Sequence, residues 1–537
     1  MTRPVRAVAP GCAWPDHPAW TEATDTPETV ATSDRLAWAR GLEPALVWTE
    51  FASLSAIPRR SKHEHQAVAY ALAQLAAFGV TSRLDHAGNI VADIPASADA
   101  TSAEPVILQA HLDMVCEADG TVATHPAADG VFPELLDGWV HAPGTTLGAD
   151  DGIGVAVALA IAAQAMDGRP ADAPHPPIQL LLTVDEEVDF TGAAAVDRDL
   201  IAGRTLINLD SEHEDELIVG SAGGSRVSLR IPAGWEPAPE TGQVVELRIL
   251  GLVGGHSGHE IDDNVMNALK ALGYLLSIAT DRSMADESAG IRVADLSGGT
   301  ADNAIPRDAR AVLVVEPEAR AVLERTGTEV ERRMRSWRAD RDEEARVEII
   351  DWHGPRPRRV FSSRAARAAM DTLVALPSGV LAIDETRPDL VRTSTNLGIV
   401  STDDDDIVLV SHPRSSREGD LDMLHVRYAS FARLAGGTAI VTSPYPAWRP
   451  EFDSPLVRVV RAAHVEVYGR EPIITVVHAG LEAGELAARL PGLRAVSIGP
   501  TVHGAHAPGE RLDIGSVGRL YEVVRRVLAR LAVAHPT

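Results

Sequence analysis

Cysteine and lysine are almost absent from this sequence of 537 residues. Two cysteines, Cys12 and Cys116, cannot form a disulfide framework, which indicates a reducing compartment. Lysine occurs only at Lys62 and Lys270, and 76 acidic residues outweigh 49 basic ones to give a net charge of -27. Because phosphate binding needs clustered Lys and Arg, the composition argues against a nucleic acid as partner.

Long apolar runs are also missing from the sequence. No stretch reaches the roughly 18 apolar residues of a membrane-spanning helix. The N-terminus lacks the apolar segment of a secretory signal peptide. We therefore expect a cytoplasmic protein that does not interact with membranes.

The length itself is informative, because 537 residues are too many for one hydrophobic core. Residues 1–40, rich in Pro, Thr, Asp and Ala, are expected to form a loosely ordered extension. From 41 to 220, apolar strands alternate with helices, which predicts a largely parallel sheet. This pattern stops near 220 and returns near 445, so we expect one catalytic domain made of 41–220 and 445–537. Residues 221–444 are expected to form an inserted domain.

The stretch at 109–117 contains the first candidate site. An apolar strand at 106–108 leads to His111 and Asp113. Since side chains of a strand alternate, both point to the same side. A metal-binding imidazole needs a carboxylate that fixes its tautomer and orientation, and this spacing provides one. Alone, the pattern is weak, and a strand-end turn with a satisfied histidine is the alternative.

Further carboxylates follow at the ends of predicted strands. Asp150 and Asp151 follow a glycine-rich loop and begin an apolar helix at 155–165. Helix capping explains one of them, and we assign a metal role to Asp150. The strand at 178–184 ends in three acids, 185–187, which are costly to bury without a cation. Asp210 follows the strand at 205–209, and ligand sites of α/β sheets lie at such strand ends.

Other motifs are less specific. Ser61 and Glu64 have the spacing of a capping box, which predicts a helix start. His256 lies in a glycine loop, where exposure is the alternative to a positioned imidazole. Arg414 follows a strand and suits a carboxylate ligand or a surface ion pair. A late loop, 499–508, contains His503 and His506.

Mixed histidine and carboxylate ligands suit Zn²⁺, Mn²⁺ or Co²⁺. Five ligands with one shared carboxylate fit two metals about 3.5–4 Å apart. Such a pair polarises a carbonyl and lowers the pKa of a bridging water, whose proton a glutamate takes and passes to the leaving amine. The pattern therefore indicates amide hydrolysis without a covalent intermediate.

At this point the sequence resembles a known family, the Xaa-His dipeptidases of the dinuclear zinc exopeptidase superfamily. The resemblance covers about residue 42 to the C-terminal helix. It rests on a series of motifs in order: AIPRRSKHE, LQAHLDMVCE, GTTLGADDGIG, DEE, LDSE, GGHSG, GGTADNAIPR, HAGLEAG and IGPTVHGAHAPGE. It implies an α/β catalytic domain, with helices on both faces of a mixed sheet, interrupted by an inserted α+β lid domain. It also implies a small peptide substrate and a homodimer formed through the lid.

The resemblance also implies roles for single residues. Asp150 would bridge two metal ions, most simply zinc, with His111 and Asp210 completing one site and Glu187 and His506 the other. Glu186 would be the general base and Asp113 would orient His111. His506 matches the metal-binding histidine of the family better than His503 does, because a small residue and proline follow it, as they do in the family. In the lid, His256 would stabilise the oxyanion, and Arg414 or Asn267 would hold the substrate carboxylate.

Two departures from the family pattern are visible, and neither removes a ligand. Asp151 stands where the family commonly has Asn, and Ala483 where it often has Cys. Two alternatives remain open. One is a related amidohydrolase that deacylates N-acyl amino acids, and the other is a non-catalytic metal-binding homologue.

Overall fold

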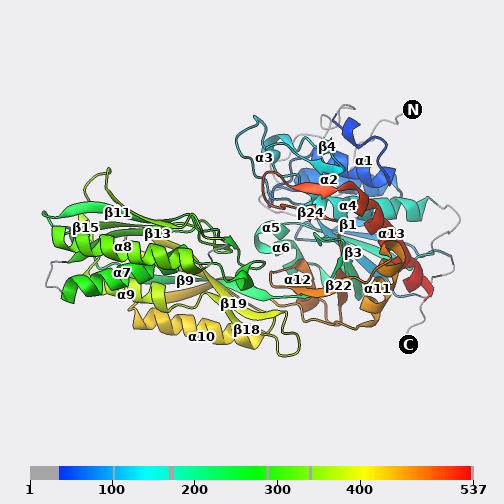
Figure 1. The fold of residues 1–537 in the computed structure, drawn as a ribbon. Helices are drawn as coiled ribbons and strands as arrows, with labels where there is room; N and C mark the ends of the chain where they lie inside the picture. The colour runs from blue at the N-terminus through cyan, green and yellow to red at the C-terminus, as the bar shows by residue number, and fades with distance from the viewer. Residues whose placement is uncertain are drawn as a thin grey trace. The chain divides into compact units, whose positions relative to one another are not determined.

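The structure is a computed structural model that describes residues 35–98, 100, 103–167, 174–285, 290–337 and 341–533. The chain forms two compact units. Unit 1 contains residues up to Gly220, Trp448–Val476 and Leu481 onward, and unit 2 contains Ser221–Ala447 and Val477–Gly480. Figure 1 labels many of the elements of both units.

Most of the expected N-terminal extension lies outside the described residues. Its described end contains a 3-10 helix, η2 (Ala37–Ala39). There the Trp38 ring meets Trp48 and Phe51 of α1 (Ala45–Ser55) edge-on, each with centroids 6.1 Å apart. An aromatic cluster therefore anchors Trp38 to α1.

Unit 1 is built on an eight-stranded mixed sheet with the order β1-β2-β6-β3-β7-β23-β8-β22. The strands are β1 (Thr81–Leu84), β2 (Ile90–Ile94), β3 (Val106–His111), β6 (Ile178–Thr183), β7 (Thr205–Asn208), β8 (Glu216–Ser221), β22 (Ile473–Val477) and β23 (Arg494–Ser497). The neighbours β6, β3, β7 and β23 run parallel to one another. Their carboxyl ends therefore meet along one edge of the sheet.

Helices cover both faces of this sheet, because the central strands are apolar on both sides. Alternate residues belong to different clusters: Leu108 and Ile207 pack into the larger core and Ile107 and Leu206 into a smaller one. The larger core includes α1, α2 (His65–Ala77), α4 (Ala149–Met166), α11 (Pro455–Tyr468) and α13 (Ile514–Val533). The smaller one includes α6 (Thr191–Ala194) and α12 (Glu482–Arg489).

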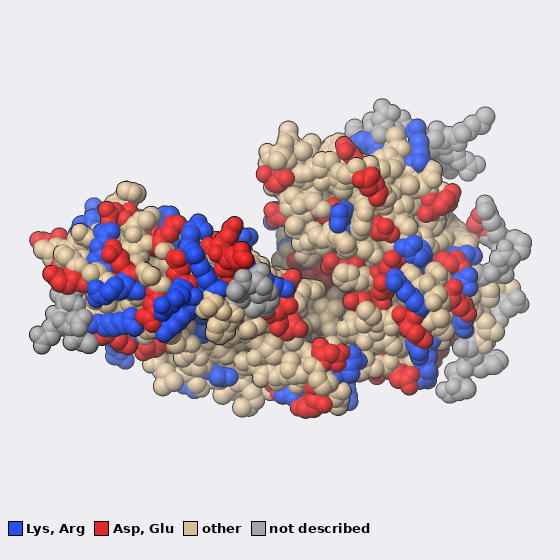
Figure 2. Space-filling view, in the orientation of Figure 1, with Lys and Arg blue, Asp and Glu red and all other residues tan. Residues whose placement is uncertain are grey.

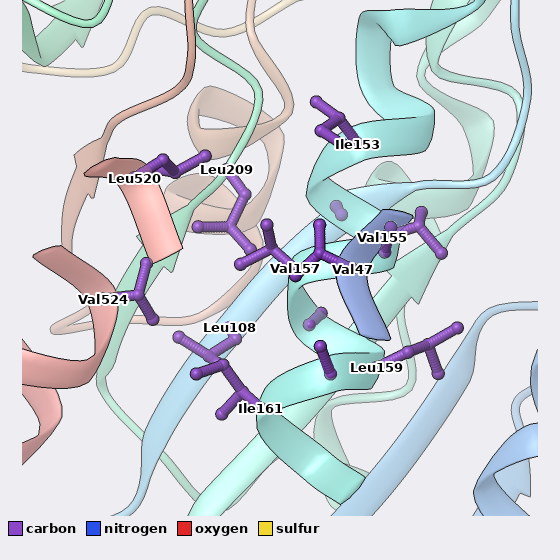
Figure 3. Close-up of a cluster of buried hydrophobic side chains, with 14 of the residues drawn as sticks. Val47, Leu108, Ile153, Val155, Val157, Leu159, Ile161, Leu209, Leu520 and Val524 are labelled. Carbon is purple, nitrogen blue, oxygen red and sulfur yellow. The ribbon is translucent and has the colours of Figure 1, made fainter. Parts of the chain in front are cut away.

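The central helix of the larger core is α4, which Figure 3 shows among side chains from α1, β3 and α13. Its alanines and β-branched residues from 152 to 162 are all buried. Among the described residues it is the one helix long and apolar enough to cross a membrane, and 72% of that stretch is buried inside the protein. A helix buried in a protein core can have the same length and apolar composition as a membrane-spanning one, and α4 is such a buried helix.

A second, four-stranded sheet in unit 1 has the order β24-β25-β5-β4. Its strands are β4 (Glu134–Leu136), β5 (Trp139–His141), β24 (Val502–His503) and β25 (Arg511–Asp513). The short elements α3 (Pro126–Asp129), α5 (Glu186–Asp189) and η3 (Arg198–Leu200) lie in connections of unit 1. The loop that leads into α4 and the loop between β24 and β25 both start from this small sheet.

Unit 2 contains an antiparallel sheet with the order β16-β11-β15-β13-β19-β20-β9-β21, and β18 pairs with β19. The strands are β9 (Gly223–Pro232), β11 (Gln243–Leu250), β13 (Ile291–Gly298), β15 (Ala309–Val315), β16 (Arg346–Asp351), β18 (Gly379–Ile383), β19 (Val391–Thr402), β20 (Asp406–Ser415) and β21 (Thr438–Tyr445). Two short ladders join β10 (Glu236–Pro237) to β17 (Arg359–Val360) and β12 (Gly255–His256) to β14 (Ala304–Ile305).

One apolar cluster joins this sheet to four helices, α7 (Ala268–Ala285), α8 (Pro317–Trp337), α9 (Ser363–Ala375) and α10 (Glu418–Leu434). A 3-10 turn, η4 (Ile261–Asp263), precedes α7. The outer side of α8 carries i,i+4 ion pairs such as Arg333–Glu329 and Arg335–Glu331. Figure 2 shows acidic and basic side chains interspersed on this face. The predicted fold class, an α/β domain with an inserted α+β domain, is confirmed.

Candidate metal centre

The carboxyl ends of the parallel strands β3, β6 and β7 deliver three of the candidate ligands, and Asp150 at the start of α4 and His506 after β24 deliver the others. His111 is the last residue of β3, and Asp210 follows β7 by two residues. Glu186 and Glu187 follow β6, and His506 lies in the loop after β24. The strand ends of the large sheet and a loop of the small sheet thus bring together side chains that are up to 395 positions apart, as the numbers 111 and 506 show.

Asp150 lies between two histidines. Its Oδ1 is 3.0 Å from His111 Nε2, and its Oδ2 is 2.9 Å from His506 Nε2. The side chain is 12% exposed, and its peptide bond to Asp151 is cis. A carboxylate whose two oxygens face different imidazoles has the geometry of a bridging ligand.

Asp210 and Glu187 extend this arrangement on opposite sides. Asp210 Oδ1 lies 3.4 Å from His111 Nε2, and Glu187 Oε2 lies 2.9 Å from His506 Nε2. Candidate ligand atoms of His111, Asp150 and Glu187 all lie within 4.8 Å of one another. The structure therefore brings all five predicted metal ligands into one cluster.

Asp113 lies behind the cluster and is fully buried. Its Oδ1 is 3.3 Å from His111 Nδ1, the ring nitrogen opposite the one that faces Asp150. The same carboxylate accepts hydrogen bonds from the backbone N–H groups of Glu186 and Glu187, both at 3.1 Å. Asp113 thus ties the β3 loop to the β6 loop.

The cluster is rich in negative charge. Burial, together with the neighbouring acids, raises the pKa of Glu186 and of Asp210 well above the usual range. Burial opposes protonation of His506, but Glu187 and Asp150 outweigh it and raise its pKa to about 12. Burial thus acts in opposite directions on the carboxyl groups and on the imidazole, whereas the neighbouring acids raise the pKa of all three groups.

These observations test whether divalent cations fit the site. The donor set combines imidazole nitrogens and carboxylate oxygens, which suits Zn²⁺, Mn²⁺ and Co²⁺. Glu187 Oε1 is buried and has no hydrogen-bond partner among the described residues. A buried carboxylate oxygen without a donor is expected to bind a cation. The residues therefore fit a metal centre.

Asp151, the second candidate at the start of α4, has other partners. Its Oδ1 accepts a hydrogen bond from Gly154 N and its Oδ2 one from His111 N. The helix-capping interpretation thus holds for Asp151, although its oxygens also lie near His111 and Asp210.

The capping-box interpretation of Ser61 and Glu64 is wrong. The helix α2 begins at His65 without a side-chain cap. Ser61 Oγ donates to Asp113 Oδ2 at 2.8 Å, and Glu64 Oε1 accepts from Asp185 N at 3.0 Å. Both side chains therefore contact the strand-end loops around the candidate ligands instead of capping α2.

Two supporting residues were missed in the sequence. The fully buried Arg59 donates from Nη1 to the carbonyl oxygen of Asp113 at 2.5 Å and from Nη2 to that of Gly148, also at 2.5 Å. Glu510 accepts from the N–H groups of Leu147, Gly148 and Ala149. Both lie in motifs that carry the family resemblance, but their partners are backbone atoms, which no spacing pattern reveals.

The predicted substrate residues belong to unit 2. His256 is half-buried, and its backbone N–H donates to Glu260 Oε2 at 2.7 Å. Arg414 is 4% exposed, Nη1 donates to Tyr445 OH at 2.7 Å, and its buried Nε has no acceptor among the described residues.

Asn267 has a different environment from the one expected. Its Oδ1 accepts from the N–H groups of Leu269 and Lys270, which caps α7, and its Nδ2 donates to Leu397 O at 2.8 Å. These partners use both ends of a side chain that is 6% exposed. Asn267 therefore caps α7, and its contact with the substrate carboxylate stays a prediction.

Comparison with known proteins decides the family. The model of peptidase family M20/M25/M40 matches residues 107–530. This chain belongs to that family. The cytosol non-specific dipeptidase of Escherichia coli is 33% identical over 496 residues, which cover 91% of this chain and 98% of that protein.

Solved structures agree with this membership. The aminoacylhistidine dipeptidase of Vibrio alginolyticus is 29% identical, with a TM-score of 0.74 and coverage of 91% of this chain and 97% of that one. The aminopeptidase PepT of Bacillus cereus shares the fold at 17% identity, a TM-score of 0.52 and coverage of 91% and 99%. The resemblance drawn from the motifs is confirmed, and the chain is a hydrolase of the peptidase class.

Proposed function

We propose that this family member is a metal-dependent dipeptidase whose unit 1 holds two divalent cations. The observation that carries the proposal is the position of Asp150 between His111 and His506. Asp150 would be the ligand shared by both cations, His111 and Asp210 would hold one of them, and Glu187 and His506 would hold the other. Two bound cations would supply a Lewis acid for the peptide carbonyl and lower the pKa of a water between them.

Glu186 is the general base in this proposal. Its backbone is held by Asp113, and its side chain stands in the same acidic cluster as the ligands. A carboxylate beside the cations can take a proton from the attacking water and deliver it to the leaving amine. Asp113 keeps His111 in the tautomer whose Nε2 is free to bind metal.

Unit 2 is proposed as the lid that binds the ends of the substrate. Arg414 would pair with the C-terminal carboxylate, because a guanidinium matches a carboxylate with two parallel hydrogen bonds. His256 would stabilise the oxyanion. We propose Xaa-His dipeptides as substrates, since one relative is named an aminoacylhistidine dipeptidase. The Escherichia coli relative is named a non-specific dipeptidase, so dipeptides with other C-terminal residues must be assayed as well.

Zinc is the proposed metal, since a donor set of two imidazoles and three carboxylates suits it. Manganese and cobalt accept the same donors. The cytoplasm is the proposed location. The two cysteines and the name of the Escherichia coli relative support it.

A homodimer through unit 2 is proposed as the assembly. Strand β21 is at the edge of its sheet, and its Ile440 and Val441 are 49% and 41% exposed. On the adjoining α10, Met423, Val426 and Leu434 are 69%, 60% and 85% exposed. A second copy would pair this edge and cover these side chains. Light scattering should give twice the chain mass of 57.0 kDa, and Val426→Lys should lower that mass to one chain.

The proposed activity is tested with a dipeptide panel on protein stripped with a chelator and reloaded with one metal at a time. β-Ala-His, Ala-His, Gly-Leu and N-acetyl amino acids are compared. We expect hydrolysis of dipeptides with a free C-terminus, the fastest ending in histidine, and none without metal. Faster hydrolysis of the N-acetyl amino acids would instead make the protein a deacylase.

A further inference from the structure

A chain of hydrogen bonds in unit 2 ends on Arg414. Arg226 donates from Nε and Nη2 to both oxygens of Asp302, each at 3.0 Å. His412 Nδ1 lies 3.0 Å from Asp302 Oδ2, and its Nε2 lies 3.0 Å from Tyr445 OH. Tyr445 OH also receives a hydrogen bond from Arg414 Nη1 at 2.7 Å.

Each donor and acceptor in this chain has a fixed direction. The hydrogen bonds from His412 and Arg226 outweigh burial and hold the pKa of Asp302 below its usual range, so its carboxylate accepts. His412 Nδ1 must then carry a proton. Burial and the Arg414 charge lower the pKa of His412 to about 4, so the ring is neutral and its Nε2 accepts. Tyr445 therefore donates to His412 and accepts from Arg414.

Sheet register explains how these residues meet. His412 and Arg414 are two positions apart on β20, so they share a face. Tyr445 lies on β21, and β9 runs between β20 and β21. Gly224 of β9 pairs with both Arg414 and Tyr445. A methyl group at Gly224 would overlap the phenol of Tyr445, so the glycine gives that ring room to cross β9.

The contact with Tyr445 determines which edge of the Arg414 guanidinium remains available to a ligand. Nη1 is committed to Tyr445, whereas the buried Nε has no acceptor among the described residues. The edge formed by Nε and Nη2 is one of the two edges of a guanidinium that bind a carboxylate with parallel hydrogen bonds. A buried donor without an acceptor is costly, which favours an anionic ligand at that edge.

We propose that Tyr445, oriented by His412 and Asp302, is a positioning residue that presents the Nε edge of Arg414 to the C-terminal carboxylate of the dipeptide. It sets the selectivity for a free C-terminus. This inference rests on the proposed function of Arg414.

The test compares the best dipeptide of the panel with its C-terminal amide. In Tyr445→Phe the ring stays and the acceptor for Nη1 is lost. We expect KM for the dipeptide to rise about tenfold, the usual scale for a hydrogen bond to a charged group, while kcat and the KM of the amide stay near wild type. Gly224→Ala should have the same effect without removing the hydroxyl.

Tyr428→Phe is the matched control. Its phenol is also buried in unit 2, but it contacts Thr395 rather than Arg414. This variant should keep the wild-type preference for the free carboxylate. Equal melting temperatures and metal contents of the variants verify that they fold.

The variant Arg414→Lys separates the proposed carboxylate role of Arg414 from the proposed positioning role of Tyr445. If it abolishes the preference for the dipeptide over the amide while Tyr445→Phe retains it, the positioning role is wrong and the carboxylate role of Arg414 stands. If Arg414→Lys also retains the preference, the carboxylate role fails and the positioning role fails with it.

Discussion

Glu510 and Asp150 are 360 positions apart, yet Glu510 holds the backbone that delivers Asp150. Its Oε2 accepts from Leu147 N at 2.7 Å and Gly148 N at 3.0 Å, and its Oε1 accepts from Ala149 N at 2.7 Å. Three consecutive amides therefore point at one buried carboxylate. The peptide that follows places Asp150 between the two histidines.

Replacing Glu510 should weaken metal binding. In Glu510→Gln at least one of the three amides loses its acceptor, because an amide side chain offers only one carbonyl oxygen. We expect metal affinity to fall about 10- to 100-fold, the usual effect of losing a residue that supports the ligands. Competition with a coloured chelator measures it. Glu134→Gln, on the exposed strand β4, is the control, and equal affinities in both variants would refute the role of Glu510.

Gly148 and Gly469 make a matched pair for stability, since both have φ +69. A Cβ at Gly148 would meet Arg59 Nη2 at 2.6 Å and Met114 Sδ at 2.7 Å, whereas nothing lies within 4 Å of Gly469. Gly469→Ala should cost about 1 kcal/mol for the backbone alone. Gly148→Ala should cost more and also release metal. Urea unfolding with and without chelator checks this, and equal losses would contradict the packing at Gly148.

Glu50 should make stability depend on pH. It is 3% exposed on α1 and accepts a hydrogen bond from Tyr70 OH at 2.6 Å. Burial raises the pKa of Glu50 from 4.5 to about 7. Between these values the folded protein keeps a proton that the unfolded chain releases. Its stability therefore falls as pH rises, by about 3 kcal/mol in total.

Glu50→Gln removes this titration. The stability of the variant relative to wild type should increase from pH 4.5 to about 7 and then level off. Chemical unfolding at several pH values measures the difference. A difference that does not change over this range would mean that Glu50 titrates normally in the folded protein.

Three of the candidate ligands could be predicted from strand ends, because parallel strands place their carboxyl ends together, whereas the choice of His506 over His503 came from the family resemblance. Apolar runs before His111, Glu187 and Asp210 marked those ends. The support behind the cluster was not readable. Arg59 and Glu510 bind backbone atoms of distant loops. The spacing of Ser61 and Glu64 is that of a capping box, and it does not reveal the contact of Ser61 with Asp113.

In unit 2 the sequence was less informative for a similar reason. Asn267 is a polar residue before a helix, and only its neighbours in space reveal that it caps that helix. The contact of His412 with Tyr445 depends on β9 lying between their strands, and on a glycine at the crossing point. Strand order and register of this kind do not follow from local patterns.

The metal content and turnover of Glu186→Gln test the central claim most directly, namely two cations with a separate glutamate base. Wild-type protein and Glu186→Gln should each hold two metal ions per chain, while turnover of the variant falls about 10²- to 10⁴-fold, the usual range for a general base. Glu187→Gln should lose metal. Glu186→Gln with one metal ion, or with full activity, would contradict the account.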